Sequence, residues 1–583
     1  MAGMSNHVNL DALIKRADLA TRGEEGEEIS SLNVTGLEPK GFLYPALRKP
    51  DFQRETASWT PEQVADLIGT FVRLDLIPSV ILWRAGQHVF VIDGAHRLSA
   101  LIAWVHDDYG DGIVSRKYFH DFIPDDQRRA AARTRDLVAA AIGSYQDHKM
   151  AIDYPENARA DVAERAQRIG WQQIQVQWIR NADHDKAEKS FFRINQGGTK
   201  IDAVEQRILK ARGSANALSA RAIMRGGTGN RYWDKFNHDV QKRISEFGRD
   251  IYRLLFEPPL SLPIKTLDVP VGGPGYGPKA LPFVFDLVNV VNRTKTADSG
   301  SRNVSKDDLP IDHTGEMTVS YLDATRSVIR RLCSNHPSSL GLHPVLYFYA
   351  KSGTFQSGAL LAFVELFREW ETKQFLAFTH IRASFEYFLL TNRGHTEAVR
   401  RLGSGSRSRP RLVAFYRRVV TELQGGSSAS EIAQKLAVDP AFDFFISPQG
   451  DFLDLEEGDF SRETKGAAFL QSALPSAPKC PTCGGFLHIN GMQVGHRQPK
   501  REGGMASVAN AMMQHPFATA RLRIDCRREV TGLKHVRRSL RIEKKAQEPS
   551  LIQSRGLEAT MFSLPAPSKV RSVWLRPFSR KAP

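Results

Sequence analysis

Val91-Ile92-Asp93-Gly94-Ala95-His96-Arg97-Leu98-Ser99-Ala100-Leu101 is the stretch of this 583-residue sequence that decides the fold. The residues leading into it, from His88, favour a β-strand, and Leu98–Val105 is an apolar run of helical character. An earlier run, Ser79–Trp83, is also rich in strand-forming residues, and Arg-Ala-Gly-Gln joins the two runs as in a hairpin. The pattern therefore predicts a strand, a DGAHR turn and a helix within an α/β domain.

The flanking segments extend this domain in both directions. Thr60, Pro61 and Gln63 form the pattern of a capped helix start, and apolar residues then recur at helical spacing. Further along, Ile174–Ile179 is typical of a strand and Ala203–Ala211 of a helix. These elements place the DGAHR turn inside a domain of alternating strands and helices.

The DGAHR turn has the chemistry of an anion site. Backbone N–H groups at a helix start favour anions, Gly94 allows close approach to the backbone, and Arg97 offers a fork for phosphate oxygens. Asp93 could hold Mg²⁺ or orient a water molecule, and His96 could donate to a phosphate or carry a proton. Together these groups suit a nucleotide, although an Asp-Gly turn before a helix is also a common structural device.

Length and composition bound the remaining possibilities. A chain of 583 residues is long enough for several domains, and 41% hydrophobic with 25% charged residues is an ordinary globular composition. No apolar run reaches the length of a membrane span, and the N-terminus lacks the pattern of a secretory signal, so we expect no membrane partner and a cytoplasmic location. Four cysteines in so long a chain exclude a disulfide framework.

The net charge of +16 is concentrated at the C-terminal end. From Lys479 onward the chain has 20 lysines and arginines but 6 aspartates and glutamates, an excess of 14. Because lysines and arginines bind DNA phosphates whatever the base sequence, this excess predicts a DNA partner whose binding weakens steeply with salt. A solvated basic tail is the plainer interpretation of the same charge.

A second group of polar residues lies within this basic section. Cys480 and Cys483 form a CxxC pair, which reads as half of a metal knuckle. After it come His496, a Gly-Gly pair, Asn510 and His515. A hairpin that carries one histidine and a helix that carries a second are the order expected of a ββα-metal nuclease site.

The N-terminal motifs resemble a known domain. The ordered segments PDFQR (50–54), WTP (59–61), VIDGAHRLSAL (91–101) and FRIN (192–195) are similar to the ParB/sulfiredoxin-like DGQQR domain of GmrSD-like type IV restriction and phage-defence proteins. The resemblance spans about 160 residues and implies that the domain binds and hydrolyses a nucleoside triphosphate, ATP or GTP. It implies that the triphosphate site contains Gln53, Arg54, Asp93, Gly94, His96, Arg97 and Asn195, with Asp93 and Arg97 catalytic.

The C-terminal motifs resemble the HNH endonuclease family. The resemblance implies that His496 is the general base, that Asn510 braces the loop, and that His515 binds the catalytic Mg²⁺ or Mn²⁺. The family usually has a metal-binding Asp or His directly before the base, where this chain has Gly495. The Cys480 and Cys483 pair implies a structural Zn²⁺, with Cys526 or His488 as candidates to complete it.

These patterns divide the chain into six expected segments. They are a flexible lead-in over residues 1–40, an α/β nucleotide-binding domain over 41–215, a helical middle domain over 216–402, a linker and helical connector over 403–470 that opens with a basic linker at 403–411, a ββα-metal HNH domain over 471–530, and a basic tail over 531–583.

The resulting hypothesis is a nucleotide-regulated DNA endonuclease or nickase that acts against foreign or modified double-stranded DNA. Homo-oligomers or partner proteins of a defence system are compatible with it. The alternatives are a non-catalytic, nucleotide-switched DNA-binding adaptor, favoured by Gly495, and a nucleotide-dependent kinase, disfavoured by the nuclease motifs.

Overall fold

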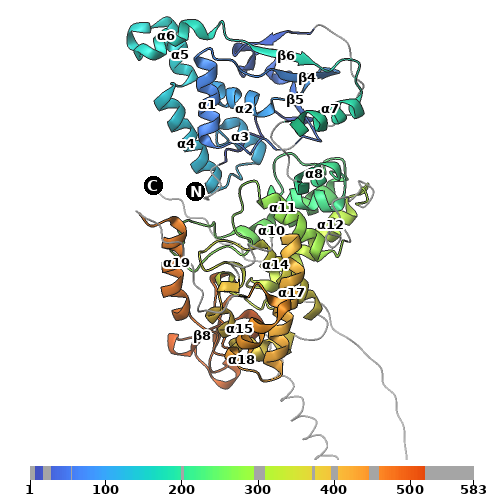
Figure 1. The fold of residues 1–583 in the computed structure, drawn as a ribbon, viewed down its shortest axis with the longest axis vertical. Helices are drawn as coiled ribbons and strands as arrows, with labels where there is room; N and C mark the ends of the chain where they lie inside the picture. The colour runs from blue at the N-terminus through green and yellow to red at the C-terminus, as the bar shows by residue number, and fades with distance from the viewer. Residues whose placement is uncertain are drawn as a thin grey trace, which may run out of the picture. The chain divides into compact units, whose positions relative to one another are not determined.

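The computed structural model describes residues 7–17, 28–53, 55–197, 203–294, 309–370, 375–395, 405–445 and 459–518. The N-terminal part is built on a mixed six-stranded sheet in the order β1-β3-β5-β4-β6-β2 (Figure 1). The strands are β1 (Arg16–Ala17), β2 (Ser31–Leu32), β3 (Leu47–Pro50), β4 (Val80–Ala85), β5 (His88–Asp93) and β6 (Ile174–Trp178).

Both faces of this sheet are covered by helices. Leu82 and Val91 pack on one face with the buried sides of the helices α1 and α2, while Trp83 and Phe90 pack on the other face with Phe191 of α7. The alternation arises because successive residues of a strand point to opposite faces. The helices of this part are α1 (Pro61–Val72), α2 (Ala95–His106), α3 (Ile113–Phe119), α4 (Asp125–Ala141), α5 (Tyr145–Asp153), α6 (Ala160–Ile169) and α7 (His184–Gly197).

The predicted strand, turn and helix around DGAHR are confirmed. β4 and β5 pair antiparallel as a hairpin, β5 ends at Asp93, and α2 begins at Ala95. The predicted capping box is also present, because Thr60 and Gln63 exchange side-chain and backbone hydrogen bonds at the start of α1. The expected strand at Ile174–Ile179 is β6.

Within residues 7–17 and 28–40, which the structure describes, the chain differs from the flexible lead-in predicted over residues 1–40. Arg16 and Ala17 form the edge strand β1 beside β3, and Ser31 and Leu32 form β2 beside β6. Val8, Leu10, Leu13 and Ile14 are buried in the core of the sheet domain. The short apolar runs of this segment are too brief to show helical or strand periodicity, so their burial was not predictable from spacing.

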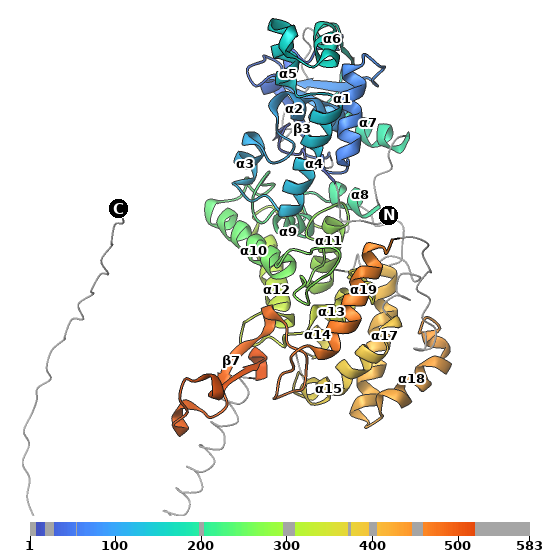
Figure 2. The same cartoon turned by 90° about the vertical axis from the view of Figure 1, so that its left-hand side faces the viewer.

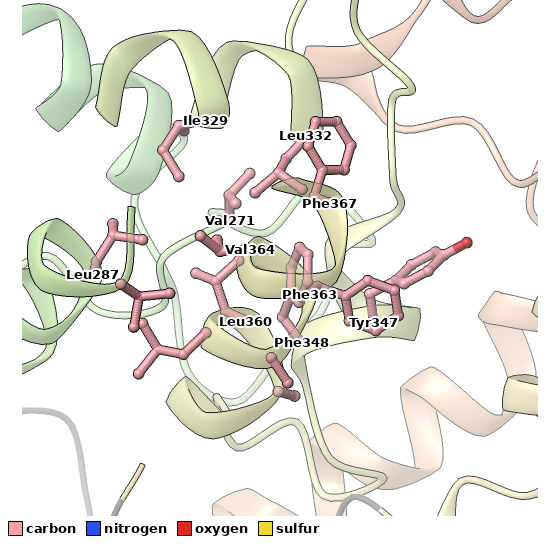
Figure 3. Close-up of a cluster of buried hydrophobic side chains, with 14 of the residues drawn as sticks. Val271, Leu287, Ile329, Leu332, Tyr347, Phe348, Leu360, Phe363, Val364 and Phe367 are labelled. Carbon is pink, nitrogen blue, oxygen red and sulfur yellow. The ribbon is translucent and has the colours of Figure 1, made fainter. Parts of the chain in front are cut away.

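The chain continues into a helical part with one large apolar core, whose buried residues run from Ile208 to Phe486. Figure 3 shows part of it, where Leu287, Ile329, Phe348 and Phe363 meet from four helices. The helices are α8 (Ala203–Lys210), α9 (Ala215–Met224), α10 (His238–Phe256), α11 (Ala280–Val291), α12 (Glu316–Leu332), α13 (Pro344–Phe348), α14 (Ser357–Trp370), α15 (Phe375–Thr391), α17 (Gly405–Gln424), α18 (Ala429–Val438) and α19 (Arg462–Ala473).

The basic linker expected at residues 403–411 is a helix from residue 405 onward. α17 begins at Gly405 and includes Pro410. Ser408 and Arg409 of this segment are buried, and Arg409 forms an ion pair with Glu365. The glycine, serine and proline content favoured a linker, but packing of Leu412 and Phe415 in the helical core overrides that local preference.

The last described part is a knuckle over residues 479–487 followed by a two-stranded hairpin. β7 (Gln493–His496) and β8 (Ala511–Gln514) pair antiparallel, and in Figure 2 this hairpin, orange to red, extends away from the helices. The second histidine, expected on a helix, instead directly follows β8, and residues 516–518 are helical. Within the described residues, no helix has both the length and the apolar character that crossing a bilayer requires. The expected basic tail over 531–583 lies outside the described residues.

Candidate functional site

The turn between β5 and α2 depends on a glycine. Gly94 has a φ of 91°, in the left-handed region, and forms the N-cap of α2. A Cβ at this position would lie 2.6 Å from Cγ1 of Val80, so no other residue fits without movement. The turn therefore presents backbone N–H groups at the start of a twelve-residue helix, next to the side chains of Asp93, His96 and Arg97.

The charged groups of the turn pair with each other. Nη2 of Arg97 donates to Oδ2 of Asp93 at 2.6 Å and to the backbone oxygen of Ser79 at 3.2 Å. The Arg97 side chain is 17% exposed and that of Asp93 34% exposed, so an incoming ligand can reach the carboxylate. A charge-assisted pair of this length holds both side chains in one orientation.

The neighbouring histidine is held by the segment before α1. Nε2 of His96 lies 2.8 Å from Oγ of Ser58, and its ring lies over Trp59 with centroids 5.4 Å apart. Gln53, 5% exposed, donates from Nε2 to the backbone oxygen of Ile92 at 3.4 Å. The structure thus brings four predicted residues together at the end of β5, namely Gln53, Asp93, His96 and Arg97. Arg54 and the side chain of Asn195 lie outside the described residues.

Sequence reasoning missed a buried charge network on the same side of the domain. Oδ1 of Asp11 accepts from Nζ of Lys49 at 2.6 Å and from Nη2 of Arg16 at 3.0 Å, and Oδ2 accepts from Nη2 of Arg225 at 3.2 Å. Burial would raise the pKa of the Asp11 carboxyl, but these cations bring that pKa well below its usual range. The four residues come from separate places in the sequence, and no spacing links them.

The cysteine pair forms a metal-binding arrangement with His515. One ligand atom from each of Cys480, Cys483 and His515 lies within 4.8 Å of the other two, and no other group of three or more such residues is found in the part of the chain that the structure describes. Sγ of Cys483 lies 3.2 Å from Nδ1 of His515. Two thiols and an imidazole are typical zinc ligands, and a structural zinc takes four.

The protonation of these groups favours a metal. A hydrogen bond from the Cys483 thiol lowers the pKa of Cys480, which favours the thiolate form that binds metals. Nε2 of His515 lies 3.1 Å from the backbone oxygen of Phe486. The tautomer that donates to this oxygen leaves the Nδ1 lone pair facing Cys483, which is the usual arrangement of a metal-bound histidine.

A buried ion pair joins this knuckle to the helical core. Arg382 and Glu386 on α15 are 2% and 1% exposed and lie 2.7 Å apart. Oε2 of Glu386 accepts from the backbone N–H of Phe486 at 2.6 Å, and Nη2 of Arg382 donates to the backbone oxygen of Gly341 at 3.0 Å and lies 3.2 Å from His515. The knuckle is therefore fixed to α15 through fully buried charges.

Asn510 ties together the loop between the hairpin strands. Its Oδ1 accepts from the backbone N–H of Gln498 at 2.7 Å, and its Nδ2 donates to the backbone oxygens of Gln498 and Met505 at 3.1 and 2.8 Å. His496, at the end of β7, is half-buried, and no group in the described residues hydrogen-bonds to its Nε2. The exposed basic residues Arg497 and Lys500 follow it.

The expected joint role of His496 and His515 at one catalytic metal is not supported by the strand register. His496 pairs with Ala511, and His515 lies four residues further along the chain, directly after β8, a separation of roughly 13 Å at about 3.3 Å per residue. His515 is 1% exposed and faces the two cysteines. The residues present therefore do not fit a site in which His515 binds the ion at which His496 acts as the base.

The positions expected to complete either metal site also differ. A Cβ on Gly495 would lie 2.2 Å from Nε2 of Gln514, so the amide of Gln514 occupies the space that a metal-binding side chain would need. His488 does not join the cysteine pair, because its Nδ1 lies 3.6 Å from Sγ of Cys333 in the helical core. Cys526 lies outside the described residues. Ala518, one helical turn after His515, packs in the same cluster as Cys480.

Comparisons with known proteins bear on the N-terminal part. Residues 38–212 match the family model described as the GmrSD restriction endonuclease, N-terminal domain. This range contains β3 to β6 and the DGAHR turn. Neither the search of curated proteins nor the search of solved structures found a match. The sheet domain, with its Gly94 turn, is therefore similar to the N-terminal domain of GmrSD restriction endonucleases over residues 38–212.

Proposed function

We propose that the protein is a nucleotide-regulated DNA endonuclease or nickase of the restriction type, acting in phage defence on double-stranded DNA that is foreign or modified. The observation that carries the proposal is the match of residues 38–212 to the GmrSD restriction endonuclease N-terminal domain. The clustering of Gln53, Asp93, His96 and Arg97 around a helix start, and the basic C-terminal section, support it.

In the sheet domain, the proposed ligand is a nucleoside triphosphate. The N–H groups at the start of α2 and the guanidinium of Arg97 would bind phosphate oxygens. Asp93 would orient the attacking water or hold Mg²⁺, and His96, already fixed by Ser58, would donate to a phosphate. In this arrangement the Asp93–Arg97 pair loosens when phosphate competes for the guanidinium.

In the hairpin, the proposed base is His496. Its imidazole would take a proton from water, whose oxygen then forms a bond to phosphorus while the bond to the leaving deoxyribose oxygen breaks and that oxygen takes a proton from solvent. Asn510 holds the loop that carries Arg497 and Lys500 beside this histidine, and these cations would contact DNA phosphates. The HNH assignment of this module belongs to the proposal.

The knuckle is proposed to hold a structural zinc. Cys480, Cys483 and His515 would supply three of its ligands, and the metal would crosslink the knuckle to the end of β8. Elemental analysis of the purified chain should give about one zinc per molecule, and Cys483→Ser should lower this value. A zinc-free wild-type protein would remove this part of the proposal.

Plasmid nicking tests the nuclease directly. The wild type and His496→Ala would be compared with supercoiled DNA, in Mg²⁺ and in Mn²⁺, with and without ATP or GTP. We expect nicking by the wild type and a loss of about 100-fold or more in the variant, the range that a general base contributes. His336→Ala, at an exposed site that the proposal does not use, is the matched control and should nick normally. Equal rates for wild type and His496→Ala would reject the assignment of the base.

Phosphate release tests the sheet domain. Asp93→Ala and Arg97→Ala should each release less phosphate from ATP or GTP than the wild type. The exposed pair Arg159 and Asp161 on the same domain offers a control, since Asp161→Ala removes a carboxylate away from the turn. Unchanged hydrolysis in both turn variants would reject the nucleotide site.

A second function, a nucleotide-switched DNA-binding adaptor without cleavage, is favoured by the amide of Gln514 in the space next to Gly495. If the missing ligand prevents cleavage, the double variant Gly495→Asp with Gln514→Ala should bind Mn²⁺ more tightly than the wild type in calorimetry. Gly495→Asp alone should gain less affinity for Mn²⁺, because the side chain of Gln514 must first move out of the space that the new carboxylate needs. Robust nicking by the wild type would exclude the adaptor.

A further inference from the structure

A cavity of about 140 Å³ lies next to the proposed nucleotide site. One wall includes Gln53, Glu55 and Ser58 of the sheet domain, and another includes Arg221 and Arg225 of the helical part. A water molecule occupies roughly 10–15 Å³ of a cavity volume measured in this way, so the cavity has room for on the order of ten waters. This space is enough for a chain of phosphates. Ser58 contacts His96, and Gln53 contacts the end of β5, so the cavity adjoins the DGAHR turn.

Arg221, on α9, is the unusual residue of this cavity. It is 3% exposed, and no group in the described residues accepts a hydrogen bond from its Nη1. Its guanidinium stacks on the ring of Tyr232 at 4.0 Å. Burial lowers its pKa, and the nearby Arg16 and Arg225 lower it further. A buried cation with an unused donor is costly for a protein to keep, unless a ligand supplies the acceptor.

The surrounding carboxylates are already engaged elsewhere. Glu55 accepts two hydrogen bonds from Arg225, and Asp11 is shared among Arg16, Lys49 and Arg225. The wall itself has two cations, Arg221 and Arg225, and three carboxylates, Asp11, Glu55 and Glu205. Arg16 and Lys49 do not line the cavity but pair with Asp11, so the whole group has four cations and three carboxylates. An anion would therefore be drawn to Arg221 rather than to the wall as a whole.

A second unused polar atom defines the ligand further. Oε1 of Gln53, at the wall formed by the sheet domain, is buried and has no partner in the described residues. The rest of the lining is largely apolar and includes Phe119, Met224 and Tyr276. An anionic group for Arg221, a hydrogen-bond donor for Gln53 and a flat apolar part for the remaining wall together describe a nucleotide.

We propose that this cavity binds the phosphate chain of a nucleoside triphosphate, with Arg221 as a direct contact from the helical part. The inference rests on the proposed function, because it extends that nucleotide site beyond the DGAHR turn. α9 packs in the core of the helical part through Leu218 and Ile223. A phosphate on Arg221 would therefore connect the state of the nucleotide to the helices that carry the knuckle.

Thermal unfolding of the full chain tests this site. ATP and inorganic tripolyphosphate should raise the Tm of the wild type, whereas adenosine should raise it much less. Arg221→Met should lose the shift with tripolyphosphate and bind it at least about tenfold more weakly. Without ligand, the Tm of Arg221→Met should equal or exceed that of the wild type, because the variant removes a buried donor that lacks a partner. If Arg221 had only a structural role, Arg221→Met would instead have a lower Tm than the wild type in the absence of ligand.

Two further variants keep the test decisive. Arg243→Met removes an exposed arginine of α10 and should keep the full shift. Arg221→Lys keeps the positive charge and should keep part of the rise in Tm with tripolyphosphate. This variant provides the test if Arg221→Met does not fold. An unchanged shift in Arg221→Met, or no shift of the wild type with either phosphate compound, would overturn the site. If the shift depends on Arg221 but the chain neither hydrolyses ATP nor nicks DNA, the proposed function fails and the anion site stands.

Discussion

At the DGAHR turn, a single backbone conformation positions Asp93, His96 and Arg97 of the proposed nucleotide site. Gly94 has a left-handed φ and packs against Val80, which fixes where α2 begins. That start sets the spacing by which Arg97 reaches back to Asp93. The turn is therefore as important to the site as the charged side chains.

Gly94→Ala tests this dependence. The variant should lose about 1–3 kcal/mol of unfolding free energy, because alanine adds left-handed strain and a clash with Val80. Gly86→Ala is the matched control, since Gly86 also has a positive φ but no atom within 4 Å of its Cβ position. Urea unfolding should show the larger loss at Gly94. Equal losses at the two positions would contradict the packing argument.

The role of individual residues was predictable where the chemistry is local. The DGAHR side chains follow a strand directly, so their meeting place was readable from the sequence. The meeting of His515 with Cys480 and Cys483 was not, because a histidine after the second strand fits two roles and only the register decides between them. No sequence pattern indicated a role for Arg221, because the residues around it in the cavity come from distant segments of the chain.

Among the elements, α15 has a function beyond packing, because it holds the knuckle. Glu386 accepts from Arg382, from the hydroxyl of Tyr347 and from the backbone of Phe486. Arg382 in turn reaches the loop before α13 and His515. The knuckle, and with it the base of the hairpin, is thereby attached to the helical core.

Glu386→Gln tests this attachment. Removing the carboxylate leaves the guanidinium of Arg382 buried and unpaired, which should cost about 3–5 kcal/mol of unfolding free energy. The exposed i,i+4 pair of Glu164 and Arg168 is the control, and Glu164→Gln should change stability little. The midpoint of urea unfolding measures both. A small effect of Glu386→Gln would show that the knuckle does not depend on this pair.

Helices and strands that depend on neighbouring residues were predicted better from the sequence than strands that depend on pairing with distant parts of the chain. The β4–β5 hairpin, α1 and α2 were readable because caps, turns and periodicity act over few residues. β1 and β2 were not, since each has two residues and depends on pairing with β3 and β6. The basic linker predicted at 403–411 is wrong from residue 405 onward, because these residues are poor helix formers that packing of the rest of α17 in the core holds in a helix.

Across the whole molecule, buried neutral histidines set the response to acid. Burial lowers the pKa of His395 to about 4 and that of His488 to about 4. Both are then uncharged in the folded protein, whereas in the unfolded chain they take up protons below about pH 6.5. The unfolded state binds more protons between these values, so stability must fall as the pH decreases.

This linkage gives a prediction for the pH dependence of stability. Between about pH 6.5 and pH 4, each histidine should cost up to about 3 kcal/mol of unfolding free energy. The Tm should drop over this interval, and His395→Gln should make the drop shallower. His313→Gln, at an exposed position, should leave the slope unchanged. A Tm independent of pH down to about pH 5 would contradict the buried neutral state.

We propose that one chain couples a nucleotide site in its sheet domain to DNA cleavage at its hairpin. The most direct measurement is the rate at which the purified protein nicks supercoiled plasmid with and without ATP or GTP, in the wild type, His496→Ala and Arg97→Ala. We expect nicking that responds to nucleotide in the wild type, no nicking in His496→Ala, and nicking that no longer responds to nucleotide in Arg97→Ala. Nicking that is absent from the wild type under every nucleotide and metal condition would contradict it.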